Sequence, residues 1–168
     1  MTGATNATSA VTGRRVLVAG IGNVFRADDG FGPAVTARLA ALPLPSGVRV
    51  WDVGIRGIHL AYDIFDGGYE RVIIVDAVSR GAPPGTIHLI EPAVDGIAVD
   101  TMPDAHSMGP DAVLSVLKRL GATLPPLVIV GCEPGSLEDD MGLTEPVNRA
   151  IADAVDVVLQ LLTPPGTA

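Results

Sequence analysis

Two carboxylates and one imidazole lie at positions from which they could meet: Asp29, Asp76 and His106. Asp29 lies in a glycine-rich segment, Asp76 directly follows the apolar run 71–75, and His106 lies in a loop that leads to a helical pattern. Carboxylates and imidazole are both ligands of divalent transition metals. A carboxylate can also activate water as a general base. These residue types therefore favour a metal site or a hydrolytic site.

Each of these residues also has an ordinary structural interpretation. An aspartate near the end of a strand often caps the next helix, and Asp28 could do so for a helix that begins near Phe31. A single histidine in a polar loop is commonly solvated rather than bound to a metal. Asp76 departs furthest from these interpretations, because it extends a strand that is apolar throughout.

Short β-branched runs alternate with segments of helical spacing along the chain. Strands are predicted at 15–19, 48–53, 71–75, 86–90 and 127–130, and helices at 31–42, 58–65, 111–120 and 145–162. Thr144 could cap the last of these helices. The alternation predicts an α/β fold with a mostly parallel sheet covered by helices on both faces. In such sheets ligands bind beyond the carboxyl ends of the strands, where the three candidate residues can converge.

Length and composition indicate one folded domain. The chain has 168 residues, of which 48% are apolar, and we expect a single catalytic domain over 14–163 between tails at 1–13 and 164–168. The net charge is −8 and Lys118 is the only lysine, which argues against nucleic-acid binding because phosphate backbones favour clustered basic residues. Cys132 is the only cysteine, so no internal disulfide exists.

The sequence contains no obvious membrane or export segment. Arg14-Arg15 precede an apolar run in the manner of an export signal, but Gly20 and Gly22 interrupt that run. No stretch approaches the roughly 18 apolar residues that a membrane helix needs. We therefore expect a soluble, cytoplasmic protein without a membrane partner.

Two common α/β functions are excluded by missing residues. A phosphate-binding P-loop requires a Gly-Lys-Ser/Thr sequence, which does not occur. A phosphoacceptor receiver domain would need a lysine after a late strand, where Gly131 and Cys132 stand instead.

Three other interpretations stay open. Residues 20–22 resemble the start of a dinucleotide-binding fingerprint, and Asp52 could be its ribose-binding acid. Phe25 stands in place of the third glycine of that fingerprint, which disfavours close packing of the helix over a pyrophosphate. Cys132 could act as a nucleophile with His106, although buried inert cysteines are commoner. The chain could also be a non-catalytic domain that binds a metal or a partner protein.

Six short motifs, each weak alone, occur together in one order. They are Gly20-Ile-Gly-Asn23 with Ala27-Asp28-Asp29-Gly30-Phe31-Gly32, Gly54-Ile-Arg-Gly57, Val75-Asp76-Ala77, His106-Ser-Met-Gly109, Gly131-Cys-Glu-Pro134 and Gly142-Leu-Thr-Glu-Pro-Val147. In this order they resemble the nickel–iron hydrogenase maturation proteases, over about residues 15–162. The resemblance implies a compact αβα sandwich around a twisted sheet. It also implies a hydrolase of aspartic or metal-dependent type, an endopeptidase that removes the C-terminal extension of a hydrogenase large-subunit precursor after nickel insertion.

The resemblance assigns roles to particular residues of this chain. The family's metal-contacting and catalytic residues map onto Asp29, Asp76 and His106. They would complete the coordination of a nickel ion that the precursor carries, rather than hold a metal in the free protease. Gly22 and Asn23 would let the substrate backbone approach the site.

The sequence departs from the family pattern at two places. Asp29 stands where Glu is common in the family, and its side chain is one methylene shorter. Gly135 stands where many relatives carry Glu after the proline that matches Pro134.

Overall fold

The structure is a computed structural model that describes residues 14–93, 95 and 109–164. The segment that contains His106, the N-terminal tail and residues 165–168 lie outside the described residues.

Five strands form one sheet in the described part of the chain. They are β1 (Val16–Ile21), β2 (Val48–Gly54), β3 (Arg71–Ala77), β4 (Ile87–Ile90) and β5 (Leu127–Cys132), in the spatial order β2-β1-β3-β5-β4. The pairs of β1 with β2, β1 with β3 and β3 with β5 are parallel. β4 pairs antiparallel with β5 at one edge. The predicted α/β class with a mostly parallel sheet is therefore confirmed.

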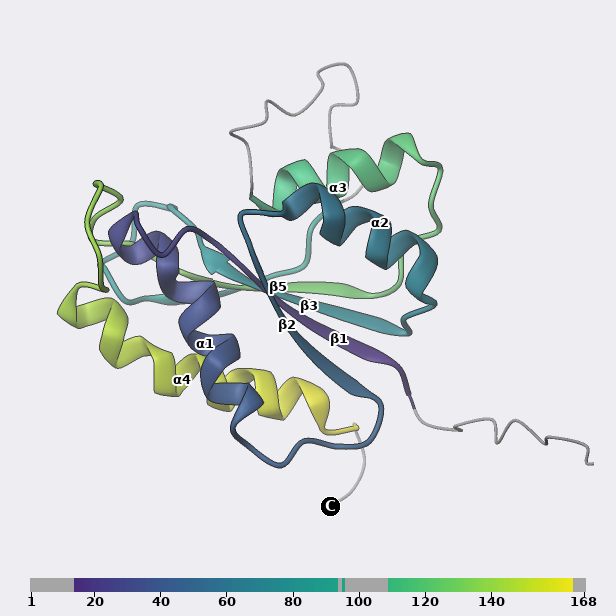
Figure 1. Cartoon of the computed structure of the whole chain (residues 1–168), viewed down its shortest axis with the longest axis horizontal. Helices are drawn as coiled ribbons and strands as arrows, with labels where there is room; N and C mark the ends of the chain where they lie inside the picture. Colours follow the sequence, from purple (N-terminus) through teal and green to yellow (C-terminus); the bar gives the residue numbers. More distant parts are fainter. Residues whose placement is uncertain (1–13, 94, 96–108, 165–168) are drawn as a thin grey trace, which may run out of the picture.

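Helices cover both faces of this sheet. They are the short 3-10 helix η1 (Ala27–Gly30), α1 (Phe31–Ala40), α2 (Gly57–Gly67), α3 (Pro110–Arg119) and α4 (Glu145–Leu162). Figure 1 shows α1 and α4 on one side of the sheet and α2 with α3 on the other. Two apolar clusters follow this division, one joining α1 and α4 to the sheet and the other joining α2 and α3 to it. The molecule is thus a three-layer αβα sandwich.

The central strands are apolar because both of their faces are covered. Every residue of β1 is buried, and only the two end residues of β3 are partly exposed. Such continuous apolar runs are typical of strands that lie between two helical layers. Asp76 is the exception in β3, since its carboxyl group is buried at the end of an otherwise apolar strand.

The first turn of α1 packs closely against the carboxyl ends of β1 and β3. A Cβ atom at Gly32 would lie 2.2 Å from the carbonyl oxygen of Ile21 and 2.5 Å from that of Val75. Only a glycine fits between the first turn of α1 and the carboxyl ends of β1 and β3. The close helix–strand contact that Phe25 in place of a third glycine disfavours is therefore made at Gly32.

Within its described ranges the chain contains no helix long and apolar enough to cross a membrane.

Candidate active site

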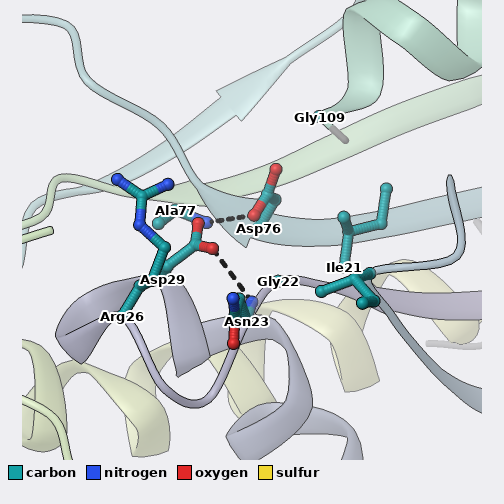
Figure 2. Close-up of a pocket in the computed structure, with 9 residues that line it drawn as sticks. Ile21, Gly22, Asn23, Arg26, Asp29, Asp76, Ala77 and Gly109 are labelled. Carbon is teal, nitrogen blue, oxygen red and sulfur yellow. Dashed lines mark hydrogen bonds between the residues drawn. The ribbon is translucent and has the colours of Figure 1, made fainter. Parts of the chain in front are cut away.

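A pocket of about 430 Å³ opens beyond the carboxyl ends of β1 and β3. Its lining comes from the ends of the strands, the loops that follow them and the start of α3: Ile21, Gly22, Asn23, Arg26, Asp29, Ile55, Asp76, Ala77 and Gly109. Figure 2 shows the carboxylates of Asp29 and Asp76 facing each other across this space. The sequence predicts that both residues lie beyond the carboxyl ends of the strands, and the structure brings their side chains together there.

Asp76 is a buried acid with an altered proton affinity. Its residue is only 4% exposed, and its Oδ1 accepts a hydrogen bond of 2.8 Å from the backbone N–H of Ala77. Burial raises the pKa of Asp76 well above its usual value, and the negative charge of Asp29 raises it further. The hydrogen bond from Ala77 opposes these effects only in part. A perturbed carboxyl of this kind in a pocket is typical of a functional site.

The glycine-rich loop holds Asp29 toward the pocket. The backbone N–H of Asn23 donates a hydrogen bond of 2.9 Å to Oδ2 of Asp29. Gly22 has a φ of 142°, and a Cβ atom there would lie 1.8 Å from the carbonyl oxygen of Asp29. The absent side chain of Gly22 therefore makes room for the protein's own backbone. Gly22 and Asn23 both line the pocket.

Asp28 points away from the pocket and joins distant parts of the chain. It is fully buried, and its Oδ2 accepts hydrogen bonds of 2.7 and 2.9 Å from the N–H groups of Gly135 and Ser136. Thr144 adds a bond from its N–H to Oδ1 at 2.7 Å and one from its hydroxyl to Oδ2 at 2.8 Å. Although burial raises it, these bonds hold the pKa of Asp28 below its usual value.

Two expected helix caps are corrected by these contacts. Gly30, not Asp28, occupies the N-cap position of α1, and no side chain caps that helix. Thr144 does stand at the N-cap of α4, but its hydroxyl is turned to Asp28 and forms no cap bond. The side chains of Asp28 and Thr144 hydrogen-bond to each other across the molecule, and neither of them caps a helix end.

Sequence reasoning missed five residues of the pocket wall: Ile21, Arg26, Ile55, Ala77 and Gly109. Arg26 lies beside Asp29 in Figure 2, and its guanidinium donates to the carbonyl oxygen of Leu137 at 3.2 Å. Ile55 and Gly109 complete the wall from other loops. Ile55 lies in one of the six motifs and comes two positions after the predicted second strand at 48–53, which is the signal that could have placed it at this end of the sheet.

The pocket does not favour a dinucleotide. A pyrophosphate beyond the end of β1 would meet the negative charge of Asp29, and like charges repel at this range. Asp52, the expected ribose-binding acid, is not among the residues that line the pocket.

Cys132 is poorly suited to act as a nucleophile. Its side chain is buried in the cluster beneath α1 and α4. Burial, together with the charges of Asp28 and Glu133, raises the pKa of the thiol to about 11. A thiol that stays protonated and inaccessible is a weak nucleophile.

The carboxylate of Glu133 has a structural role, because its hydrogen bonds hold a turn of the chain in place. Its carboxylate accepts hydrogen bonds from the N–H groups of Arg80 and Gly81, and the Nε2 of His88 lies 3.0 Å from Oε2. Although burial raises it, these partners hold the pKa of Glu133 below its usual value. Glu133 fixes the turn between β3 and β4 and does not line the pocket.

His106 lies outside the described residues. Its candidate role rests on the sequence and on the place of Gly109, three positions later, in the pocket wall.

Comparison with known proteins identifies close similarities over most of the chain. The profile of the hydrogenase maturation protease family matches residues 33–161. The chain is 36% identical over 160 residues to the hydrogenase expression/formation protein HupD of Rhizobium leguminosarum bv. viciae, covering 92% of this chain and 77% of that protein.

Solved structures agree with this result. The hydrogenase maturating endopeptidase HybD of E. coli is 33% identical, with a TM-score of 0.73 over 88% of this chain and 91% of that one. The hydrogenase 2 maturation peptidase of the Thaumarchaeota archaeon SCGC_AB-539-E09 is 38% identical, with a TM-score of 0.68 over 89% and 98% of the two chains.

Proposed function

Because the chain belongs to the hydrogenase maturation protease family, we propose that it is the endopeptidase that removes the C-terminal extension of a nickel–iron hydrogenase large-subunit precursor. The observation that supports this most directly is the pair of carboxylates, Asp29 and Asp76, facing each other in a pocket at the ends of β1 and β3. In a peptidase, such a pair can bind a metal ion and activate water.

The two acids have different surroundings, and we assign them different roles. Asp76 is the general base, because burial and the charge of Asp29 raise its pKa, and a carboxylate with a raised pKa accepts a proton from water more readily. Asp29 is fixed by the N–H of Asn23 and contacts the nickel ion of the substrate. His106 completes the contacts to that ion with its imidazole. The metal belongs to the precursor and serves for recognition.

The assignment is tested by cleavage of a nickel-loaded large-subunit precursor, followed by the shift of the product on a denaturing gel. Asp76→Asn and His106→Ala are each expected to lower the rate at least 100-fold. Loss of a general base alone typically costs a factor of 10² to 10⁴.

Asp52→Asn is the matched control, because Asp52 lies on the neighbouring strand β2 but does not line the pocket. Its cleavage rate should stay within about twofold of the wild type. Normal cleavage by both Asp76→Asn and His106→Ala would overturn the site assignment.

A further inference from the structure

Four large apolar side chains form an exposed row beside the pocket. Ile55, Ile58, Tyr62 and Phe65 are between 46% and 51% exposed. Positions 58, 62 and 65 lie on one face of α2, since residues three and four apart on a helix are neighbours. Ile55 precedes the helix and continues the row to the pocket wall. We call these four residues the α2 stripe.

The fold does not use the α2 stripe to hold α2 in place. The opposite face of the helix is buried in the core through Leu60, Ala61 and Ile64. The side of α2 is fixed as well, because Asp63 accepts hydrogen bonds from Arg49 at 2.9 Å and from the hydroxyl of Tyr69 at 2.8 Å. The α2 stripe is therefore a firmly held outer surface whose residues leave much apolar area in water.

The α2 stripe is continuous with the candidate active site. Ile55 lines the same pocket as Asp29 and Asp76, and the helix then carries the row away from the pocket mouth. In Figure 1, α2 begins near the ends of the strands and runs back along the sheet. Exposed apolar side chains also occur on the loop 24–25 beside Arg26. Leu42 and Leu89, by contrast, are exposed singly in other parts of the described chain.

We propose that the α2 stripe is the surface on which the folded body of the hydrogenase large-subunit precursor docks, through an apolar patch next to its C-terminal segment. The inference rests on the proposed function. A folded protein whose chain end enters a pocket must lay its body against the rim of that pocket. The rim on the α2 side is apolar, and burial of such side chains by a partner is the main source of binding energy in interfaces.

The precursor fits this position better than a second copy of the chain. A copy seated on the α2 stripe would cover Ile55 and stand at the entrance through which the scissile segment must pass. Docking of the substrate itself meets no such conflict. Ile58, Tyr62 and Phe65 do not line the pocket that holds the carboxylates, so this part of the stripe supplies affinity without taking part in the chemistry.

The inference is tested with the triple variant Ile58→Ser, Tyr62→Ser and Phe65→Ser of the full chain. We expect the dissociation constant for the nickel-loaded precursor and the KM of cleavage to rise at least tenfold, while kcat stays within about twofold. Interface side chains that dominate binding typically have such effects when truncated. Ile55 is left intact because it lines the pocket.

Leu42→Ser is the matched control, because Leu42 is similarly exposed but follows α1 at the other end of the sheet. It should change neither the dissociation constant nor KM by more than twofold. The single variant Tyr62→Glu provides a second test with one surface change. Unfolding temperatures confirm that each variant is folded.

The outcomes separate the docking surface from the proposed function. Unchanged binding and KM in the triple variant and in Tyr62→Glu would overturn the docking inference while leaving the endopeptidase intact. Self-association of the wild type that the triple variant abolishes would assign the α2 stripe to a second copy and overturn the inference too. Precursor binding that depends on the stripe, without any cleavage by the wild type, would support the docking surface and refute the endopeptidase.

Discussion

At the scale of single residues, Asp76 combines a cost to folding with a chemical use. Its carboxyl group is buried beside Asp29, and both the burial and the nearby charge raise its pKa. Free energy is therefore lost when Asp76 ionises in the folded protein. Such a group is expected in a site that binds a cation or accepts a proton, and it has no stabilising purpose in the free protein.

This conflict predicts that Asp76→Asn stabilises the free protein while it stops cleavage. The folded pKa lies above the unfolded one, so the wild type loses stability as pH rises from the unfolded to the folded value. The gain in unfolding temperature is therefore larger at pH 8 than at pH 4. It should reach a few degrees, since 1 kcal/mol corresponds to roughly 2–4 °C in a chain of this size.

Thermal unfolding of the metal-free protein at several pH values measures this difference. Asp153→Asn, an exposed position on α4, serves as the control and should leave the unfolding temperature unchanged at every pH. An unfolding temperature of Asp76→Asn equal to that of the wild type at pH 8 would show that Asp76 carries no such penalty.

At the scale of elements, the loop between β1 and α1 is built to carry a carboxylate. Gly22 allows the chain to return onto Asp29, the N–H of Asn23 holds the Asp29 side chain, and Asp28 attaches the loop to Gly135 and Thr144. Ala27 adopts a φ of 45°, a conformation that costs energy for a residue with a side chain. Contacts on both sides of the loop hold it in this shape.

The loop predicts different outcomes for two glycine substitutions that share a positive φ. Gly22→Ala would place a Cβ atom 1.8 Å from the carbonyl oxygen of Asp29, whereas Gly121→Ala would meet nothing within 4 Å. Gly121→Ala should cost only the backbone penalty of about 1–2 kcal/mol. Gly22→Ala should cost more and also abolish cleavage, because Asp29 must move.

Denaturant unfolding and the cleavage assay, applied to both variants, compare these effects. If Gly22→Ala cleaves the precursor as fast as Gly121→Ala, the position of Asp29 does not depend on the close approach at Gly22.

The elements differ in how far the sequence could predict them. α1, β3 and α4 follow from local apolar spacing, and their observed bounds lie within about two residues of the predicted ones. The antiparallel direction of β4 has no local signal, because a four-residue strand reads the same in either direction. Its direction is set by pairing with β5, which lies about 40 residues further along the chain.

The candidate site shows the same division. Asp29 and Asp76 could be placed from sequence because each follows a strand of one parallel sheet, and strand ends of that kind share an edge. The actual role of Asp28 could not be found, since its partners lie 107 to 116 positions away. The local sequence predicts only helix caps for Asp28 and Thr144, whereas contacts between distant parts of the chain determine what their side chains bind.

At the scale of the whole molecule, the proposed partner brings the metal. Under the proposed function Asp29 and His106 contact the nickel ion, so that ion needs further ligands that the precursor provides. We expect the isolated protease, after incubation with nickel and dialysis, to retain far less than one ion per chain. It should cleave the nickel-loaded precursor without added metal and leave the metal-free precursor intact.

Metal analysis of the dialysed protein and the gel assay with both forms of the precursor measure these expectations. Stoichiometric retention of nickel by the protease alone, or equal cleavage of both forms, would contradict a metal that enters with the substrate.

The position of β5 between β3 and β4 affects the order in which a newly made chain can fold. β4 leaves the ribosome before β5 does, yet β5 is its partner in the sheet and separates it from β3. The bonds of Asp28 likewise await residues 135 to 144. A nascent chain that already carries Asp29 and Asp76 therefore lacks the contacts that hold their loop and strand in place until residues 127–144 have been synthesised.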